Sequence, residues 1–94
     1  MSKVVLQGYI IAPTVDLPAV LEELPHHIQN TRSEPGCLIF EVTQDKENGN
    51  RFDVYEEFAS EDDFSLHQER VRNSKWGAIT VNVERNYKVT RIDS

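Results

Sequence analysis

The sequence predicts an α+β fold in which a four-stranded antiparallel sheet carries its helices on one face. Two apolar–polar alternating runs, residues 37–44 and 51–59, are joined by a loop with an Asn-Gly pair, which is typical of a β-hairpin. Strand-like runs rich in β-branched and aromatic residues also begin and end the chain, at residues 4–11 and 86–92. The two long intervals between these runs show helical spacing.

The first helix is expected between the opening strand and the hairpin. Asp16 is placed to cap it, and Pro18 falls in its first turn, where a missing N–H has little cost. Pro25 is expected to break or kink this helix, and Pro35-Gly36 to end the helical region. Its apolar positions at helical spacing are Val20, Leu21, Leu24 and Ile28.

The second helix is expected over residues 61–74, because Ser60 and Asp63 form a capping-box pattern. Residues 76–84 fit either a short helix or a strand, and spacing alone leaves both open. The resulting order, β-α-β-β-α-β, is that of the ferredoxin-like fold.

The opening strand also predicts a partner. Both of its faces, in residues 4–11, are largely apolar, so both are expected to be covered. Helices cover one face of the sheet, and the chain has nothing left for the other. We therefore expect a homodimer that packs through the sheet faces.

Length and charge exclude several classes of protein. Ninety-four residues make one small domain, 1–94, and a net charge of −6 disfavours nucleic acid or an anionic membrane as partner. No apolar run approaches the roughly 20 residues that span a bilayer. The N-terminus reads as a strand and not as a signal peptide, so a cytoplasmic location is expected.

Metal and disulfide chemistry are not expected. The single cysteine, Cys37, excludes an internal disulfide and a cysteine-based zinc site, and beside a turn it reads as a small buried hydrophobe. The three histidines, at 26, 27 and 67, lack the spacing of a metal site. The sequence also shows no nucleophile–base pair and no glycine-rich phosphate loop.

His67 is the main candidate for chemistry. At about 100° per residue it shares the inward helix face with Phe64 and Val71. It is either a core-edge histidine satisfied by one hydrogen bond or a pocket histidine that moves a proton near neutral pH. Trp76 is either a core or interface anchor or an aromatic wall for a flat substrate.

Further polar groups alternate on two strands. Gln7 and Tyr9 lie on one face of the opening strand. In the same way Asp53, Tyr55 and Glu57 occupy every second position, and so one face, of the second hairpin strand. If these face a partner's sheet, they place hydrogen-bonding groups in an apolar lining. Alternation alone does not decide whether Glu56 or Glu57 points into that space.

Several segments resemble the antibiotic biosynthesis monooxygenase-like domains: "SEPGCLIFEVTQD", "NRFDVYEEFASEDDFSLHQ", "HQERVRNSKWGAITVNVERNYKV" and "LPHHIQNTR". The resemblance implies a ferredoxin-like subunit of a dimeric α/β barrel and a helix at residues 76–84. It also implies membership of a family that includes oxygenases which oxidise polycyclic phenols or quinols without added metal or flavin. His67 matches the family's pocket histidine. Gln7 matches a first-strand site where haem-degrading relatives place asparagine, whereas at the His67 position those relatives carry tryptophan, so the chain departs from their pattern.

The working hypothesis is a cofactor-independent monooxygenase that oxidises a small aromatic quinol or phenol between sheet and helices. His67 would be the base, Gln7, Tyr9 and Tyr55 would bind the substrate, and Trp76 would flank its ring. The alternatives are a non-catalytic dimeric module that binds a small ligand, and a dimer that only stabilises another protein.

Overall fold

The computed structural model describes residues 2–93 and confirms the α+β, ferredoxin-like fold. Within those residues, no helix is long and apolar enough to cross a membrane. In chain order the elements are β1 (Ser2–Ile11), η1 (Thr14–Asp16), α1 (Leu17–Arg32), β2 (Cys37–Gln44), β3 (Arg51–Phe58), α2 (Glu61–Arg72), α3 (Lys75–Ile79) and β4 (Glu84–Asp93).

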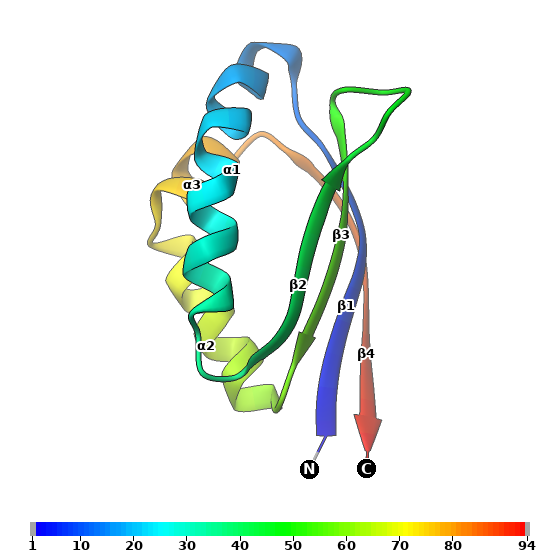
Figure 1. Ribbon diagram of the computed structural model, residues 1–94, viewed down its shortest axis with the longest axis vertical. Helices are drawn as coiled ribbons and strands as arrows, with labels where there is room; N and C mark the ends of the chain where they lie inside the picture. Colours follow the sequence, from blue (N-terminus) through cyan, green and yellow to red (C-terminus); the bar gives the residue numbers. More distant parts are fainter. Residues whose placement is uncertain (1, 94) are drawn as a thin grey trace.

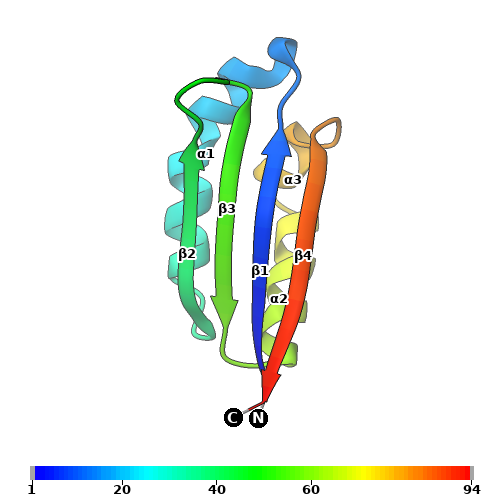
Figure 2. The same cartoon turned by 90° about the vertical axis from the view of Figure 1, so that its right-hand side faces the viewer.

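The four strands form one antiparallel sheet in the order β2-β3-β1-β4. All three α-helices lie against one face of this sheet (Figure 1), and the other face, seen from the front in Figure 2, is turned away from them. We call these the helix face and the outer face. The two ends of the described chain lie at the same end of the sheet.

Strand alternation separates the two faces. On β3 every second side chain is buried against the helices, and β1 supplies the residues paired with them in register, such as Leu6 opposite Glu56. The core cluster of this face includes Val4, Leu6, Ile10, Phe52, Val54, Phe58, Phe64 and Trp76. Residues of opposite parity, beginning with Lys3 on β1 and Arg51 on β3, therefore lie on the outer face.

Helix α1 differs from the expectation in three ways. It runs unbroken through Pro25, because Pro25 and Leu21, whose carbonyl loses its partner, are both exposed and open to water. Its buried stripe is largely polar and consists of Val20, Glu23, His27 and Thr31. The Asp16 side chain makes no capping hydrogen bond.

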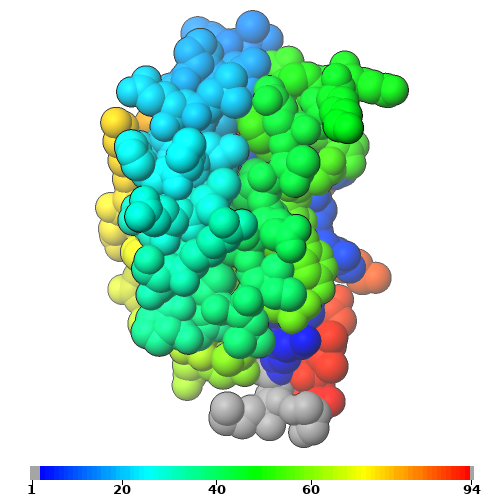
Figure 3. Space-filling view, in the orientation of Figure 1, coloured from blue at the N-terminus to red at the C-terminus, as the bar shows by residue number. Residues whose placement is uncertain are grey.

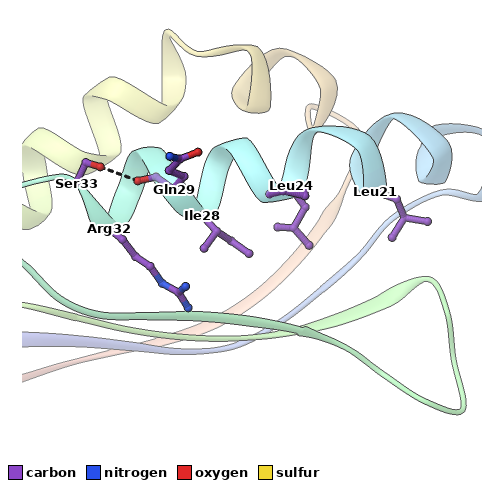
Figure 4. A pocket seen from close by; sticks show the side chains of 7 residues that line it. Leu21, Leu24, Ile28, Gln29, Arg32 and Ser33 are labelled. Carbon is purple, nitrogen blue, oxygen red and sulfur yellow. Dashed lines mark hydrogen bonds between the residues drawn. The ribbon is translucent and has the colours of Figure 1, made fainter.

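The apolar stripe of α1 is only half covered. It lines an open groove of about 550 Å³ beside Arg32, where the surfaces of α1 and β2 lie side by side (Figure 3). Figure 4 shows Leu21, Leu24, Ile28 and Arg32 projecting from α1 toward the strands. This groove is separate from the buried polar stripe of the same helix.

Helices α2 and α3 follow the expected signals. The Ser60 side chain accepts a hydrogen bond from the Asp63 backbone N–H and caps α2. Ser74 caps α3 in the same way at Gly77. For residues 76–84 the helical alternative is confirmed, although the helix α3 is a single short turn that ends at Ile79. Helix α2 ends at Arg72, slightly before the expected residue 74.

Gly8 lets β4 approach β1 closely. Its φ is +153°, and a Cβ added there would lie 1.9 Å from the Asn86 carbonyl oxygen. Only glycine avoids that clash. In register Gly8 lies opposite Tyr87, so the close approach brings Tyr87 over the helix face of the sheet.

Candidate active site

His67 lies where α2 crosses the sheet, buried and between the carboxyl groups of two glutamates. Its Nδ1 is 2.9 Å from Oε1 of Glu34, and its Nε2 is 3.7 Å from Oε1 of Glu56. Only 4% of the side chain is exposed. It shares the buried face of α2 with Phe64, as the spacing predicted.

Glu34 orients the His67 ring. An ionised carboxylate only accepts hydrogen bonds, so the His67 Nδ1–H is the donor in this contact. The Arg70 guanidinium donates to the other oxygen of Glu34 and, over 3.0 Å, to Oγ1 of Thr31. With the proton on Nδ1, the Nε2 lone pair of His67 points toward Glu56.

The His67 imidazole and the Glu56 carboxyl group are both neutral near pH 7. Burial, reinforced by the negative charge of Glu34, raises the pKa of Glu56 to about 8. Burial also lowers the pKa of His67, although Glu34 acts in the opposite direction. A neutral carboxylic acid thus lies beside a neutral imidazole, and one can donate a proton while the other accepts one.

These two side chains line a cavity of about 220 Å³ between the sheet and the helices. Tyr87 and Arg85 reach it from β4, and burial raises the pKa of Tyr87 to about 12, so its hydroxyl stays protonated. The remaining lining residues are Leu6, His27, Gln68, Val71 and Trp76.

His27 and Trp76 form one wall of this cavity. Their rings are stacked, with centroids 4.5 Å apart and planes at 4°. Phe40 meets His27 edge-on at 5.3 Å. Burial, reinforced by His67 when that ring is protonated and by the Arg70 guanidinium, lowers the pKa of His27 to about 3, so the His27 ring stays neutral at physiological pH.

The structure brings together only some of the predicted site residues. His67 and Trp76 line the same cavity, whereas Gln7, Tyr9 and Tyr55 lie on the outer face, because they occupy strand positions of the opposite parity. Within one subunit they do not share a pocket with His67, and a role in binding substrate stays a prediction.

Outer-face side chains contact one another across the strands. The Tyr55 hydroxyl donates to Glu57, which also pairs with Lys3 at 2.8 Å. The Arg51 guanidinium lies 3.9 Å from the centre of the Tyr9 ring. The question that alternation left open is therefore settled: Glu56 faces the helices and Glu57 faces outward.

Sequence reasoning missed several cavity residues, and two of them carried a usable signal. Glu56 has the same strand parity as Phe52 and Phe58, which marks it as inward-facing. His27 lies two turns after Val20 and so on the same helix face. Glu34 stands directly before the Pro35-Gly36 helix stop, and neither it nor Arg85 and Tyr87 has a local signal of a site.

Other features of the described chain carry less chemistry. Burial raises the pKa of the Cys37 thiol, which lowers its reactivity at neutral pH. Among residues 2–93, no three His, Cys, Asp or Glu side chains are grouped so that they could hold a metal ion. The groove of Figure 4 is larger than the His67 cavity but contains no acid–base pair.

Comparison with known proteins agrees with this architecture. The family model for antibiotic biosynthesis monooxygenase matches residues 5–75. The chain belongs to this family. The matched segment carries His67, Glu56, Glu34 and His27 but ends before Trp76 and β4. No curated protein matches the chain.

Solved structures with this fold include other members of the antibiotic biosynthesis monooxygenase family. One such monooxygenase is 19% identical with a TM-score of 0.71, and the match covers 100% of this chain and 98% of that one. A candidate family member from Nitrosomonas europaea is 20% identical with a TM-score of 0.76, covering 99% and 89%. A conserved protein of unknown function from Bacteroides thetaiotaomicron is 13% identical with a TM-score of 0.80, covering 97% and 98%. At these identities the likeness shows the fold alone.

Proposed function

We propose that this protein is a cofactor-independent monooxygenase that oxidises a small aromatic quinol or phenol in the His67 cavity. The observation that carries the proposal is the buried pairing of a neutral imidazole with a neutral carboxylic acid, 3.7 Å apart, in one small cavity. Membership of the antibiotic biosynthesis monooxygenase family supports the reaction class.

His67 acts as the base. Glu34 holds the proton on Nδ1, so Nε2 accepts the proton when a substrate O–H bond breaks. The imidazolium formed is then stabilised by Glu34 through a charge-assisted hydrogen bond. The resulting phenolate is a better electron donor than the phenol, and in a cavity shielded from water it passes an electron to O₂.

Glu56 acts as the acid. After the substrate radical and superoxide combine to form a C–O bond, the O–O bond breaks and the leaving oxygen takes protons from Glu56 and His67. The ring carbon that gained oxygen loses its C–H proton to the Glu56 carboxylate, which restores the neutral acid. For a single-ring quinol the balance is C₆H₆O₂ + O₂ → C₆H₄O₃ + H₂O. One oxygen atom enters the ring, the other leaves as water, and the substrate supplies all the electrons.

The test is oxygen uptake by metal-stripped protein with a panel of quinols and phenols, with ¹⁸O₂ to follow the oxygen atom. We expect His67→Ala to lower kcat/KM by roughly 10²–10⁴, the usual contribution of a general base. His26→Ala is the matched control, because His26 is the exposed neighbour of His27 and is absent from the cavity lining. Oxygen uptake by the His67→Ala variant at the wild-type rate would rule out His67 as the base.

A non-catalytic module that binds a small ligand is the second candidate. It is favoured by one buried polar atom each of Glu56 and His27, which have no hydrogen-bond partner within the described chain. A bound ligand would satisfy both atoms by hydrogen bonding, without any reaction. Ligand binding without oxygen uptake by any substrate, in both wild type and His67→Ala, would favour this module over the enzyme.

We also propose that two copies pack through their outer faces. Apolar side chains of β1, including Tyr9 and Ile11, face outward, and such a dimer would place Gln7 and Tyr55 between the sheets. Ile11→Glu is expected to shift the molar mass in solution from dimer to monomer. Leu66→Glu, at a 65% exposed position on α2, is the control and should leave the mass unchanged.

A further inference from the structure

Two buried polar atoms of residues that line the His67 cavity lack hydrogen-bond partners among the described residues: Nδ1 of His27 and Oε1 of Glu56. The two residues are 5% and 6% exposed, so bulk water does not reach them freely. An unsatisfied buried polar group destabilises the folded protein, because it has lost its hydrogen bonds to water and gained none in exchange. Two such atoms in one small space indicate a ligand that satisfies both.

Both atoms belong to residues that line the same space. His27, Glu56, Trp76 and Tyr87 all border the 220 Å³ cavity and also an adjoining extension of about 20 Å³. Together these volumes lie below the roughly 300–1,000 Å³ of pockets for drug-sized ligands. The space therefore fits one aromatic ring better than a polycyclic skeleton.

The plane of the His27 ring is fixed. Trp76 stacks on one face of the ring and Phe40 meets it edge-on, so the ring cannot tilt out of this plane without losing both contacts. Because the ring stays neutral, it offers a hydrogen bond and no charge. His27 is thus suited to recognise a substrate oxygen and not to remove its proton.

We infer that the site takes a single-ring ligand carrying two oxygen atoms, one held at Glu56 and the other at Nδ1 of His27. His27 is then a specificity residue that distinguishes a dihydroxylated ring from a monohydroxylated one. The chemistry of this ligand follows the proposed function, but its binding does not depend on turnover.

One buried water is the competing occupant. The extension of about 20 Å³ can hold a water molecule, which could join His27 to Glu56. That arrangement would satisfy both atoms without any ligand. It predicts that a second hydroxyl on the ring brings no gain in affinity.

The experiment is calorimetric titration without oxygen, using phenol, the three benzenediols and a naphthalenediol. Fluorescence of Trp76, the only tryptophan, reports binding in this cavity. We expect at least one benzenediol to bind roughly 3–10-fold more tightly than phenol, the effect of one added hydrogen bond. Equal affinity for phenol and all three benzenediols would overturn the inference in favour of water, and tighter binding of the naphthalenediol would overturn its single-ring part.

His27→Phe tests the residue itself, because it keeps a ring against Trp76 and removes the nitrogens. It should abolish the benzenediol preference, so that phenol and the benzenediols bind this variant with the same Kd. His27→Asn, which retains a polar atom near the position of Nδ1, should restore part of the preference. If His27→Phe does not fold, His27→Leu takes its place. A preference that survives removal of the nitrogens would contradict the inference.

The two proposals fail separately. A benzenediol preference without oxygen uptake would leave the inference intact and remove the proposed monooxygenase. Oxygen uptake dependent on His67, without a benzenediol preference, would do the reverse.

Discussion

The two faces of the sheet are built from neighbouring residues and yet have different chemistry. On β1, Leu6 is 2% exposed beneath the helices, whereas Gln7 is exposed on the outer face. On β3, Glu56 lies in the cavity, whereas Glu57 pairs with Lys3 on the other side. One step along a strand therefore changes a residue from core or active site to surface.

The adjacent glutamates show what that step does to electrostatics. Burial raises the pKa of Glu56 to about 8, whereas hydrogen bonds from Lys3 and Tyr55 lower the pKa of Glu57. The same residue type thus serves as a neutral acid on one face and as an ionised surface carboxylate on the other. Each of the following experiments compares the two faces directly.

The largest expected difference is between Leu6→Ala and Gln7→Ala. Leu6→Ala should lower the free energy of unfolding by about 2–5 kcal/mol, because it removes buried apolar atoms and enlarges a cavity. In an isolated subunit, whose outer face is open to water, Gln7→Ala should change it by less than about 0.5 kcal/mol. Chemical denaturation measures both. A large, concentration-dependent effect of Gln7→Ala would instead indicate that a second copy covers this face.

Glu56→Gln and Glu57→Gln should change the pH dependence of stability in opposite directions. The folded pKa of Glu56, about 8, exceeds its ordinary value of 4.5, so its contribution to stability is complete below pH 4.5 and is lost as pH rises through 8. Glu56→Gln should remove that loss, which amounts to a few kcal/mol. The lowered pKa of Glu57 gives stability above its ordinary pKa that is lost as pH falls, and Glu57→Gln should remove it.

Denaturation curves between pH 4 and pH 9 provide the measurement. The two variants are matched, because they make the same change at consecutive positions of β3. Parallel pH profiles for the wild type and Glu56→Gln above pH 5 would contradict the neutral, buried state of Glu56.

Tyr55→Phe is expected to have the smallest effect. It removes the hydroxyl that donates to Glu57 on the partly exposed outer face and leaves the His67 cavity unchanged. Oxygen uptake and the unfolding midpoint should both stay close to wild type. A clear rise in KM with kcat unchanged would instead support the sequence-based prediction that Tyr55 binds substrate.

The order of elements, the Ser60 cap of α2 and the inward face of α2 followed from the sequence, because each depends on local spacing and local hydrogen bonding. The predicted Asp16 cap of α1 was wrong. The β3 register of Glu56 was also within reach, since Phe52 and Phe58 share its parity. The apolar stripe of α1 gave the wrong prediction of which helix face is buried. The helix buries its polar stripe and leaves the apolar stripe half covered.

By itself the sequence determined the ferredoxin-like fold and the inward position of His67, since strand and helix periods are local properties of the chain. The partners of His67 were decided only by tertiary structure. Glu34 comes from the turn after α1, and Glu56 comes from β3. The stacked rings of His27 and Trp76 come from α1 and α3. Their protonation states depend on burial and on charges that meet only when those elements pack together, which no spacing along the chain records.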